Sequence, residues 1–507
     1  MISFLSQQIT HRKMADFVDS SKLFSKCMTE SGNERLTART VASYVESPFE
    51  IHCNKFVPEH EKDEITEYQK LLFQRGKDHE TQTVHERYPD ITKLTYTNPE
   101  EGFKLVLDSM VSGTEIFHGI PIYYLPEGLY GSADIIEKSN DADSIFGDYH
   151  YTIKEVKLAK NIKEKHLLQG AFYTLMLGQI QGRIPETFTI INGEGEESIH
   201  EYSDHEPLLL DAIDGTRRIL QGEPISPTHG GCDFPWESYS NKMAIETNDI
   251  SLVAGISSKT KTKFIDNNYK TVEDLAQAKI YDLTKMKGVG NVSALKYVNN
   301  AKAIQSKTHI VYDADSIDFP KRKMEIFLDL EGIDPTMAVG EVPLIDYMIG
   351  ILVRDESGEK YTAFTAKDTD KEREMLLEFL EFINEQNDYV IYHYHNYEKS
   401  HLSKMMEKYE VDRDTQNKVL DHLIDIHTVA TKAVYFPTYG NGLKQIAPYL
   451  GFSWQHKDVS ATESISIYLD FVKNPEANKE RFQKVIDYNE DDCVATRVIK
   501  DWLVSVK

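Results

Sequence analysis

Acidic residues at two distant places in the sequence have the types and the spacing that divalent-metal chemistry requires. The first set consists of Asp134, Glu155 and Lys157, and the second consists of Asp329, Glu331 and Asp492. Carboxylate oxygens are hard ligands that suit Mg²⁺ or Mn²⁺. A neighbouring ammonium group can stabilise negative charge that develops during hydrolysis. The two sets therefore predict two metal-dependent catalytic sites in one chain.

Strands followed by a helix must position the first set. Asp134 lies in a strand-like run, and Glu155 and Lys157 lie two residues apart on the next run, so their side chains share one face. Gln169 and Tyr173 are four residues apart on the helix that follows and share a face there. Helical periodicity is visible at 61–88 and 161–181, and strand character at 120–125, 130–137, 149–158 and 186–191.

With Gly76 and Glu80 on the upstream helix, this ordered set resembles the RecB-type branch of the PD-(D/E)XK nucleases. The resemblance implies that Glu80, Asp134 and Glu155 bind the metal, with the adjacent His79 as a further candidate ligand. The alternative is that Asp134 and Glu155 are solvent-facing strand ends without a catalytic role.

The same resemblance assigns roles to the remaining members of the set. Asp134, Glu155 and Lys157 form the catalytic core, although Lys157 could instead pair with a neighbouring acid in a structural role. Gln169 and Tyr173 are expected to contact nucleic acid or to orient the site.

The second set follows an apolar strand predicted at 324–330, and further strands are predicted at 345–354 and 360–366. Asp329 and Glu331 again share one strand face, and burying two acids there is unfavourable unless a cation offsets their charge. Tyr488 and Asp492 lie one helical turn apart, in a segment that we expect to be the start of a helix.

This arrangement resembles the ribonuclease H-like 3′–5′ exonucleases of the DEDD class, in the tyrosine subtype. The resemblance implies that Asp329, Glu331 and Asp492 hold two metal ions and that Tyr488 orients the attacking water. The middle acid of the family is an Asp, for which this chain offers Glu398.

The longer side chain of Glu398 could shift a metal ion, which leaves the activity of this second site as a question for experiment. Asp425 is a further candidate ligand. The alternative, that the acid is merely solvated at the end of an element, applies best to Asp425 and Glu490.

A third motif lies between the two sets. Gly288 and Gly290, in a Gly-Val-Gly turn between two predicted helices, resemble the hairpin of a helix–hairpin–helix unit. Such glycines let the backbone approach a phosphate, and the next helix offers free N–H groups. Lys285, Lys287, Gly288 and Gly290 are therefore expected to contact nucleic acid. A spacer that packs the two catalytic domains together is the alternative.

The length of 507 residues favours two to four domains. We predict a multidomain α/β protein with a restriction-endonuclease-like mixed sheet, a small all-α unit and a ribonuclease H-like mixed sheet. The predicted parts are an N-terminal extension (1–33), a RecB-type nuclease domain (34–245), a helix–hairpin–helix domain (246–306), a linker (307–323) and a DEDDy exonuclease domain (324–507).

The charge balance limits how the chain can bind nucleic acid. The net charge is −25, and residues 324–507 hold 34 acidic and 20 basic residues, a net of −14. Residues 257–302 hold 9 Lys and 4 acids, a net of +5. Because phosphate binding requires basic residues, the acidic balance argues against a general nucleic-acid coat, and the middle unit is the best candidate for guiding a strand.

The cysteines and the hydropathy pattern bear on cofactor and location. Cys27, Cys53, Cys232 and Cys493 are scattered and form no CxxC pair, which favours a reduced cytoplasmic compartment. Some RecB-type relatives carry a four-cysteine iron–sulfur cluster, but Cys53 and Cys232 cannot hold one alone, so we expect none. No apolar run is long enough to span a membrane.

The sequence therefore predicts a cytoplasmic, Mg²⁺- or Mn²⁺-dependent nuclease that hydrolyses phosphodiester bonds in repair or strand processing, with an exonuclease favoured. DNA is the expected substrate ahead of RNA. Two alternatives stay open. One is a nucleic-acid-binding scaffold for a helicase partner, with one or both sites degenerate, and the other is an RNA-processing nuclease.

Overall fold

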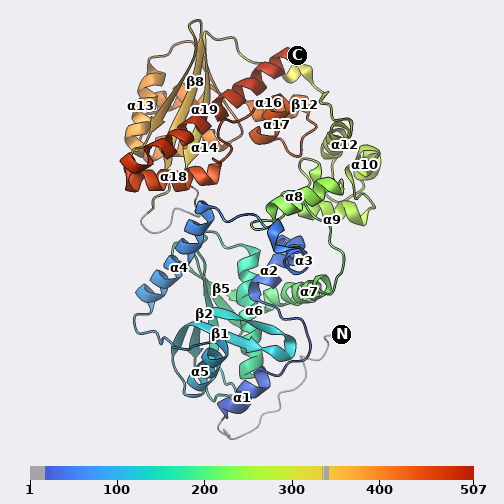
Figure 1. The fold of residues 1–507 in the computed structure, drawn as a ribbon, viewed down its shortest axis with the longest axis vertical. Coiled ribbons are helices and arrows are strands. Elements are labelled where there is room, and N and C mark those ends of the chain that lie inside the picture. The colour runs from blue at the N-terminus through green and yellow to red at the C-terminus, as the bar shows by residue number, and fades with distance from the viewer. Residues whose placement is uncertain (1–17, 334, 336–341) are drawn as a thin grey trace. The chain divides into compact units, whose positions relative to one another are not determined.

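The computed structural model describes residues 18–333, 335 and 342–507, which divide into two compact units (Figure 1). The N-terminal unit consists of the described residues up to Val57 together with Gly76–Ile225. The C-terminal unit consists of Pro58–Arg75 and Ser226–Lys507. Helix α4 (Glu67–Arg87) contributes residues to both units.

The N-terminal unit contains a five-stranded mixed sheet in the order β1-β2-β3-β4-β5. Only β3 and β4 run parallel, and helix α6 (Glu164–Gln181) makes the crossover between them. The predicted strands and this helix are present within a few residues of their expected bounds. The strands are β1 (Ile116–Tyr124), β2 (Leu129–Ser139), β3 (His150–Val156), β4 (Thr187–Ile191) and β5 (Glu197–Glu201).

Helix α6 is the centre of this unit because its apolar and small residues are buried on almost every side. Part of the segment predicted as an extension belongs to the same core: Leu23 and Cys27 of α1 are buried in it, whereas residues 1–17 lie outside the described residues. The other helices of the unit are α1 (Ser20–Cys27), α2 (Ala38–Glu46), α3 (Pro48–Phe56), α5 (Pro99–Val111) and α7 (Tyr202–Leu220).

The C-terminal unit contains a second five-stranded sheet, in the order β11-β10-β7-β8-β9. β8 is antiparallel to both β7 and β9, whereas β10 is parallel to β7 and to β11. The predicted strands at 324–330, 345–354 and 360–366 correspond to β7, β8 and β9. The strands are β7 (Met324–Gly332), β8 (Asp346–Asp355), β9 (Gly358–Thr365), β10 (Tyr389–His393) and β11 (Leu423–Asp425).

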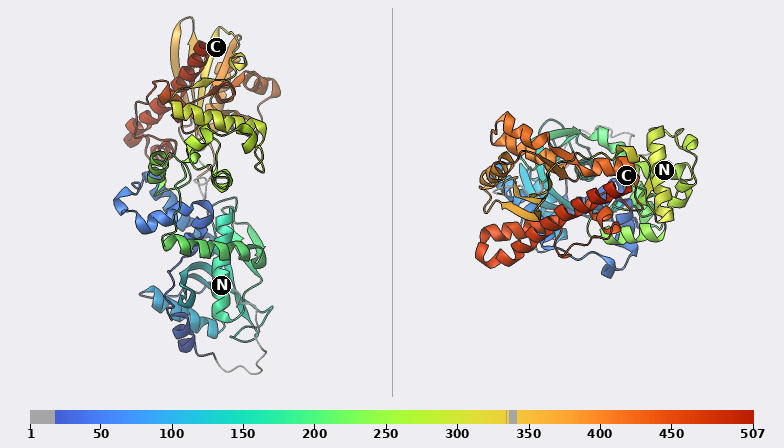
Figure 2. Two further views of the ribbon diagram at one scale, coloured as in Figure 1. Left: turned by 90° about the vertical axis from the view of Figure 1, so that its right-hand side faces the viewer. Right: turned by 90° about the horizontal axis from the view of Figure 1, so that it is seen from above.

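Alternation along β7 places its residues in two cores, and the long helix α19 (Pro475–Val506) contributes residues to both. Ile326, Leu328 and Leu330 pack into one core, and Phe327 packs into the other. Since strand side chains alternate, Asp329 and Glu331 share the face of Phe327. Figures 1 and 2 show α19 lying along this sheet.

The start of α19 differs from the prediction. We expected a helix to begin near Tyr488, but α19 begins at Pro475, with the Asn474 side chain accepting a hydrogen bond from the Ala477 N–H. Tyr488 and Asp492 therefore lie inside a long helix, and helical turns before and after them fix their positions. The other helices around this sheet are α13 (Glu372–Asn384), α14 (Tyr397–Lys408), α15 (Arg413–Leu420), α16 (Ile426–Ala433), α17 (Leu443–Tyr449) and α18 (Ala461–Lys473).

A small helical region precedes the second sheet and has an apolar core of its own. Its Gly288 has a φ of +89°, a backbone conformation that favours glycine. Gly290 then forms the N-cap of α12. The helices are α8 (Glu237–Glu246), α9 (Ser258–Asp266), α10 (Val272–Ala276), α11 (Ile280–Leu283) and α12 (Asn291–Ser306). A separate two-stranded sheet pairs β6 (Ile310–Val311) with β12 (Val434–Tyr435).

These elements confirm the predicted mixed α/β class with an all-helical insert. Within the part of the chain that the structure describes, no helix is both long and apolar enough to cross a membrane.

Candidate active sites

Three carboxylates meet where β7 and α19 cross. One ligand oxygen each from Asp329, Glu331 and Asp492 lies within 4.8 Å of the others. This is the one group of three or more candidate metal ligands among the described residues. Glu331 and Asp492 are buried and Asp329 is half-buried. Three acids at this spacing are the donor set that a hard divalent cation takes, so the residues fit the predicted metal.

The electrostatics of the three acids favour a bound cation. Burial raises the pKa of Glu331 from 4.5 to about 8, and the charge of Asp492 adds to the effect. Burial and the charges of Asp492 and Glu331 raise the pKa of Asp329 well above its usual range. Burial also raises the pKa of Asp492. A bound divalent cation would hold all three acids in the ionised form at neutral pH.

Each carboxylate also accepts a hydrogen bond from a protein donor. The Asn489 Nδ2 donates to Asp329 Oδ2 over 2.7 Å. The Ser464 hydroxyl lies 2.8 Å from Glu331 Oε2 as a donor, and the Trp454 Nε1–H donates to Asp492 Oδ1 over 2.7 Å. None of these donors was predicted, because each is distant in sequence from its acceptor.

Lys444 places a positive charge directly at this site. Its ammonium group pairs with Asp492 Oδ1 and lies 4.1 Å from the ring centroids of both Trp454 and Tyr488. The lysine lies at the start of α17, and its side chain is 42% exposed, so it can reach both the acids and solvent. No motif in the sequence indicated a role for Lys444.

Tyr488 lies beside the acids, as predicted. Its ring is buried, and burial followed by the charges of Asp492, Glu331 and Asp329 raises the pKa of its hydroxyl. The phenol therefore stays protonated at neutral pH and can donate a hydrogen bond.

The two other predicted ligands of this set differ in their surroundings. Glu398, in the first turn of α14, is buried with its Oε2 3.3 Å from His393 Nδ1, and burial raises its pKa. Its charge also contributes to the raised pKa of Asp329, although it lies outside the group of three.

Asp425 is the N-cap of α16. It accepts hydrogen bonds from the backbone N–H groups of His395 and His427 and from the Thr428 hydroxyl. Burial alone would raise the pKa of Asp425, but the Thr428 and His395 hydrogen bonds lower it overall. These hydrogen bonds show that Asp425 caps α16. Its role as a metal ligand stays a prediction.

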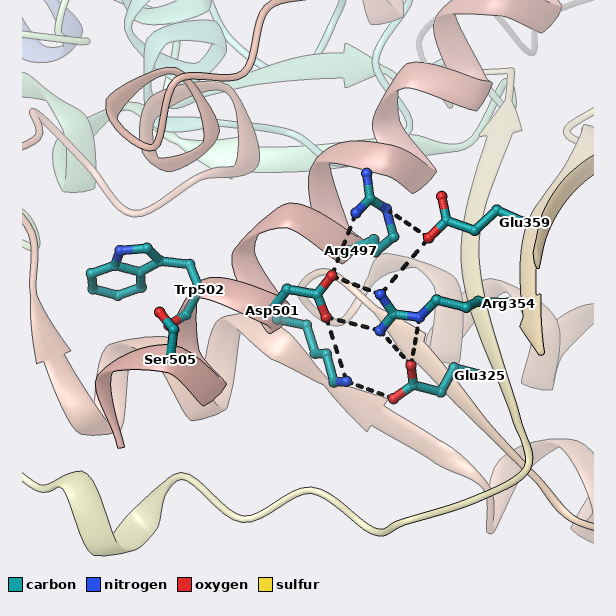
Figure 3. Close-up of polar contacts among 8 residues, drawn as sticks. Glu325, Arg354, Glu359, Arg497, Asp501, Trp502 and Ser505 are labelled. Carbon is teal, nitrogen blue, oxygen red and sulfur yellow. Dashed lines mark hydrogen bonds and ion pairs between the residues drawn. The ribbon is translucent and has the colours of Figure 1, made fainter. Parts of the chain in front are cut away.

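An ion-pair network attaches the C-terminal part of α19 to β7, which carries Asp329 and Glu331, and to the neighbouring strands β8 and β9. Arg354 on β8 pairs with Glu325 on β7, with Asp501 on α19 at 2.7 Å, and with Glu359 on β9 at 3.8 Å (Figure 3). Lys500 joins the same network through Glu325 at 2.6 Å. The side chains of Arg354 and Lys500 are 25% and 10% exposed, so the network restrains α19 against the sheet.

In the N-terminal unit, the structure brings together the core of the first predicted set. The Asp134 side chain accepts a hydrogen bond from the Val156 N–H over 2.8 Å, and the Asp134 N–H donates to Glu155 Oε1 over 3.2 Å. The Lys157 ammonium lies 2.6 Å from Glu155 Oε2 and 3.7 Å from Asp134 Oδ2. Glu155 is almost fully buried, so the three groups are not solvent-facing strand ends.

The charges in this cluster act on one another. Burial and the charge of Glu155 raise the pKa of Asp134 well above its usual range. Burial would lower the pKa of Lys157, but the charges of Glu155 and Asp134 raise it further than burial lowers it. Lys157 is therefore a fixed cation between two acids.

Glu80 lies close enough to this cluster for its charge to raise the pKa of Asp134. Its Oε1 is 3.0 Å from Nε2 of His118 on β1. No sequence motif indicated His118. His79 lies beside the Asn192 backbone instead, and burial lowers its pKa.

The helix α6 supplies the rest of the set. The Tyr173 ring fits against Gly131 of β2, where a Cβ would lie 2.8 Å from its hydroxyl oxygen. Burial and the charges of Glu155 and Asp134 raise the pKa of Tyr173. Gln169 is half-buried on the same helix. His166, which carried no sequence signal, is buried near Lys157, and burial lowers its pKa to about 4.

Two of the predicted hairpin residues, Lys285 and Lys287, contact nearby residues. Lys285 pairs with Asp282 at 2.9 Å and lies 4.3 Å from the centroid of the exposed Tyr281 ring. The Lys287 carbonyl accepts a hydrogen bond from Lys263 over 3.4 Å. Basic and aromatic side chains therefore gather around the Gly288 turn.

Comparison with known families finds two matches, and both lie in the C-terminal unit. Residues 326–504 match a family model described as the RNase H superfamily, and residues 248–299 match one described as a SAM-like helix-hairpin-helix tandem. No curated protein matches the chain. The chain therefore contains a domain of the RNase H superfamily and a helix–hairpin–helix tandem, which imply nucleic-acid binding and a nuclease or other nucleic-acid-processing function.

Proposed function

We propose that the chain is a metal-dependent nuclease whose principal catalytic centre is formed by Asp329, Glu331 and Asp492. The observation that carries this proposal is the group of three carboxylates, which lies in the RNase H superfamily domain and whose pKa values are raised by burial and by the charges of neighbouring acids. Mg²⁺ or Mn²⁺ would be held by these residues, with Glu398 as the fourth acid.

The protein groups around the metal ligands support hydrolysis. A bound divalent cation supplies the charge that activates water and stabilises a phosphate. The protonated Tyr488 hydroxyl orients a water molecule or a phosphate oxygen by donating a hydrogen bond. The Lys444 ammonium adds positive charge beside Asp492 that can neutralise a phosphate in the transition state.

We further propose that this site acts as a 3′–5′ exonuclease of the tyrosine DEDD subtype. Tyr397, beside Glu398, supports a site that binds a strand end. Its ring is 40% exposed and stacks on the His401 ring at 3.8 Å. Burial, followed by the charges of Asp346, Glu331 and Asp329, raises the pKa of the Tyr397 hydroxyl, and these charges locate it near the acids. A nucleobase at the end of a strand can stack on such an exposed ring.

The N-terminal unit is proposed as a second, RecB-type nuclease site. Asp134 and Glu155 would hold the metal with Glu80, His79 being a further candidate. Lys157 would orient the attacking water, and the clustering of these groups supports the proposal.

The proposed substrate is DNA, bound through Gln169 and Tyr173 in the N-terminal unit and through the hairpin residues Lys285, Lys287, Gly288 and Gly290. Repair or strand processing in the cytoplasm with a helicase partner is the setting that we propose. The parts 34–245, 246–306 and 324–507 remain our proposed domains.

The proposal is tested with end-labelled single- and double-stranded DNA and RNA in Mn²⁺. Wild type is compared with Asp329→Asn, Lys157→Ala and the double variant, with the surface variant Glu378→Gln as the control. We expect Asp329→Asn to abolish release of terminal nucleotides and the double variant to lose all hydrolysis. Full activity in the double variant would refute both sites.

A binding scaffold is the second candidate, and two contacts favour it. Lys444 already neutralises Asp492, and Glu398 already faces His393. A scaffold would bind nucleic acid without any Mn²⁺-dependent rise in melting temperature, whereas a metal that binds only the folded state stabilises the protein.

A further inference from the structure

We propose that Asn489 is a positioning residue that fixes the metal ligand Asp329, and that Tyr361 and Gly350 in turn fix Asn489. This inference rests on the proposed metal site. It concerns three residues, from α19, β9 and β8, that no sequence motif indicated.

Asn489 is fully buried, and both ends of its amide are used. Its Nδ2 donates to Asp329 Oδ2 over 2.7 Å, and its Oδ1 accepts a hydrogen bond from the Tyr361 hydroxyl over 2.8 Å. An ionised carboxylate can only accept hydrogen bonds, so the NH₂ group must face Asp329 and the carbonyl oxygen must face Tyr361. The amide can therefore take one orientation only while Asp329 binds a metal.

Gly350 makes room for this arrangement. It lies opposite Asp329 in the β7–β8 register. A Cβ at position 350 would overlap the Asn489 side-chain oxygen and would lie 2.8 Å from the Tyr361 hydroxyl oxygen. The glycine is required here by the close approach of a side chain, because any larger residue would displace the amide from Asp329.

The contacts have a consequence for metal binding. Asn489 donates to Asp329 Oδ2 and is itself held by Tyr361 of β9, so it restrains the rotation of the Asp329 carboxylate. Residues that orient a ligand in this way typically change metal affinity by about 10–100-fold when they are removed. Glu331 has a parallel arrangement, since Tyr347 donates to Ser464 over 2.9 Å and Ser464 lies 2.8 Å from Glu331.

The test measures Mn²⁺ affinity of the full chain by calorimetry, together with the melting temperature in EDTA. Asp134→Asn, which removes a proposed metal ligand of the N-terminal site, serves as the background, so that this site contributes less. Asn489→Leu removes both hydrogen bonds at similar volume, and Tyr361→Phe removes only the hydroxyl that orients the amide. The matched control is Tyr389→Phe, which removes a buried hydroxyl that donates to the Lys418 carbonyl over 2.7 Å.

We expect Asn489→Leu to weaken Mn²⁺ binding by about 10–100-fold and Tyr361→Phe to weaken it several-fold, with no change for Tyr389→Phe. If Asn489→Leu does not fold, Tyr361→Phe still decides the question. Unchanged Mn²⁺ affinity in Tyr361→Phe, with binding lost in Asp329→Asn, would overturn the positioning role and leave the metal site intact. Unchanged affinity in Asp329→Asn as well would overturn the proposed function.

Discussion

Removing one of the crowded acids should stabilise the metal-free C-terminal unit at alkaline pH. Burial and Asp492 raise the pKa of Glu331 from 4.5 to about 8. Between these pH values the folded protein therefore holds a proton that the unfolded chain has lost. The stability that this group contributes is fully present below about pH 4.5 and is lost as the pH rises through 8.

The size of the effect follows from the same pKa. A tenfold change in proton affinity is worth about 1.4 kcal/mol, so ionising Glu331 costs the metal-free fold at most about 5 kcal/mol above pH 8. Relaxation of the site and entry of water reduce this cost. We expect Glu331→Gln, which keeps the shape of the side chain, to raise the free energy of unfolding by about 1–3 kcal/mol at pH 8.5 in EDTA, and by much less at pH 5.

Tryptophan fluorescence during urea unfolding measures this change selectively. The three tryptophans of the chain, Trp236, Trp454 and Trp502, all belong to the C-terminal unit. The control is Glu378→Gln, which neutralises an exposed acid on α13. A stability gain that is equal at pH 5 and pH 8.5, or a loss at pH 8.5, would refute the electrostatic reasoning.

Three further predictions concern charges around the sites. Arg354→Met should lower the free energy of unfolding by about 1–2 kcal/mol in the same fluorescence assay, because it removes the cation that joins Glu325 to Asp501 and leaves these acids only Lys500 and Arg497 as partners; an unchanged midpoint would mean that the network does not restrain α19. Lys444→Met should tighten Mn²⁺ binding by about tenfold in calorimetry, because it removes a like charge from the site, while slowing hydrolysis; faster hydrolysis would argue against a role for the ammonium in the transition state. Lys287→Gln should reduce the slope of log binding constant against log salt by about 1, and an unchanged slope would exclude a phosphate contact.

The sequence predicted those parts of the fold that depend on local patterns. Alternation of apolar residues located β7 and placed Asp329 and Glu331 on one face. It also predicted the Asp134 and Glu155 strands, because pattern and face are properties of neighbouring residues. The RNase H superfamily and helix–hairpin–helix resemblances are confirmed by family matches, whereas the RecB-type and tyrosine DEDD assignments stay predictions.

The parts that could not be predicted depend on long-range packing. Asn489 donates to an acid 160 positions away and Ser464 to one 133 positions away, and no local pattern encodes such partners. The start of α19 was missed although Asn474 and Pro475 are good start signals, because its first turns are highly charged and hide the helical period. Asp425 is the N-cap of α16, and because N-caps and metal ligands use the same side chain, its role as a ligand stays a prediction.

The most direct test of the metal-dependent site is anomalous diffraction from crystals grown with Mn²⁺. We predict an anomalous peak at about 2.1–2.2 Å from oxygens of Asp329, Glu331 and Asp492, which disappears in Asp329→Asn. An Mn²⁺-saturated crystal of the wild type with no peak between these three carboxylates would contradict the account.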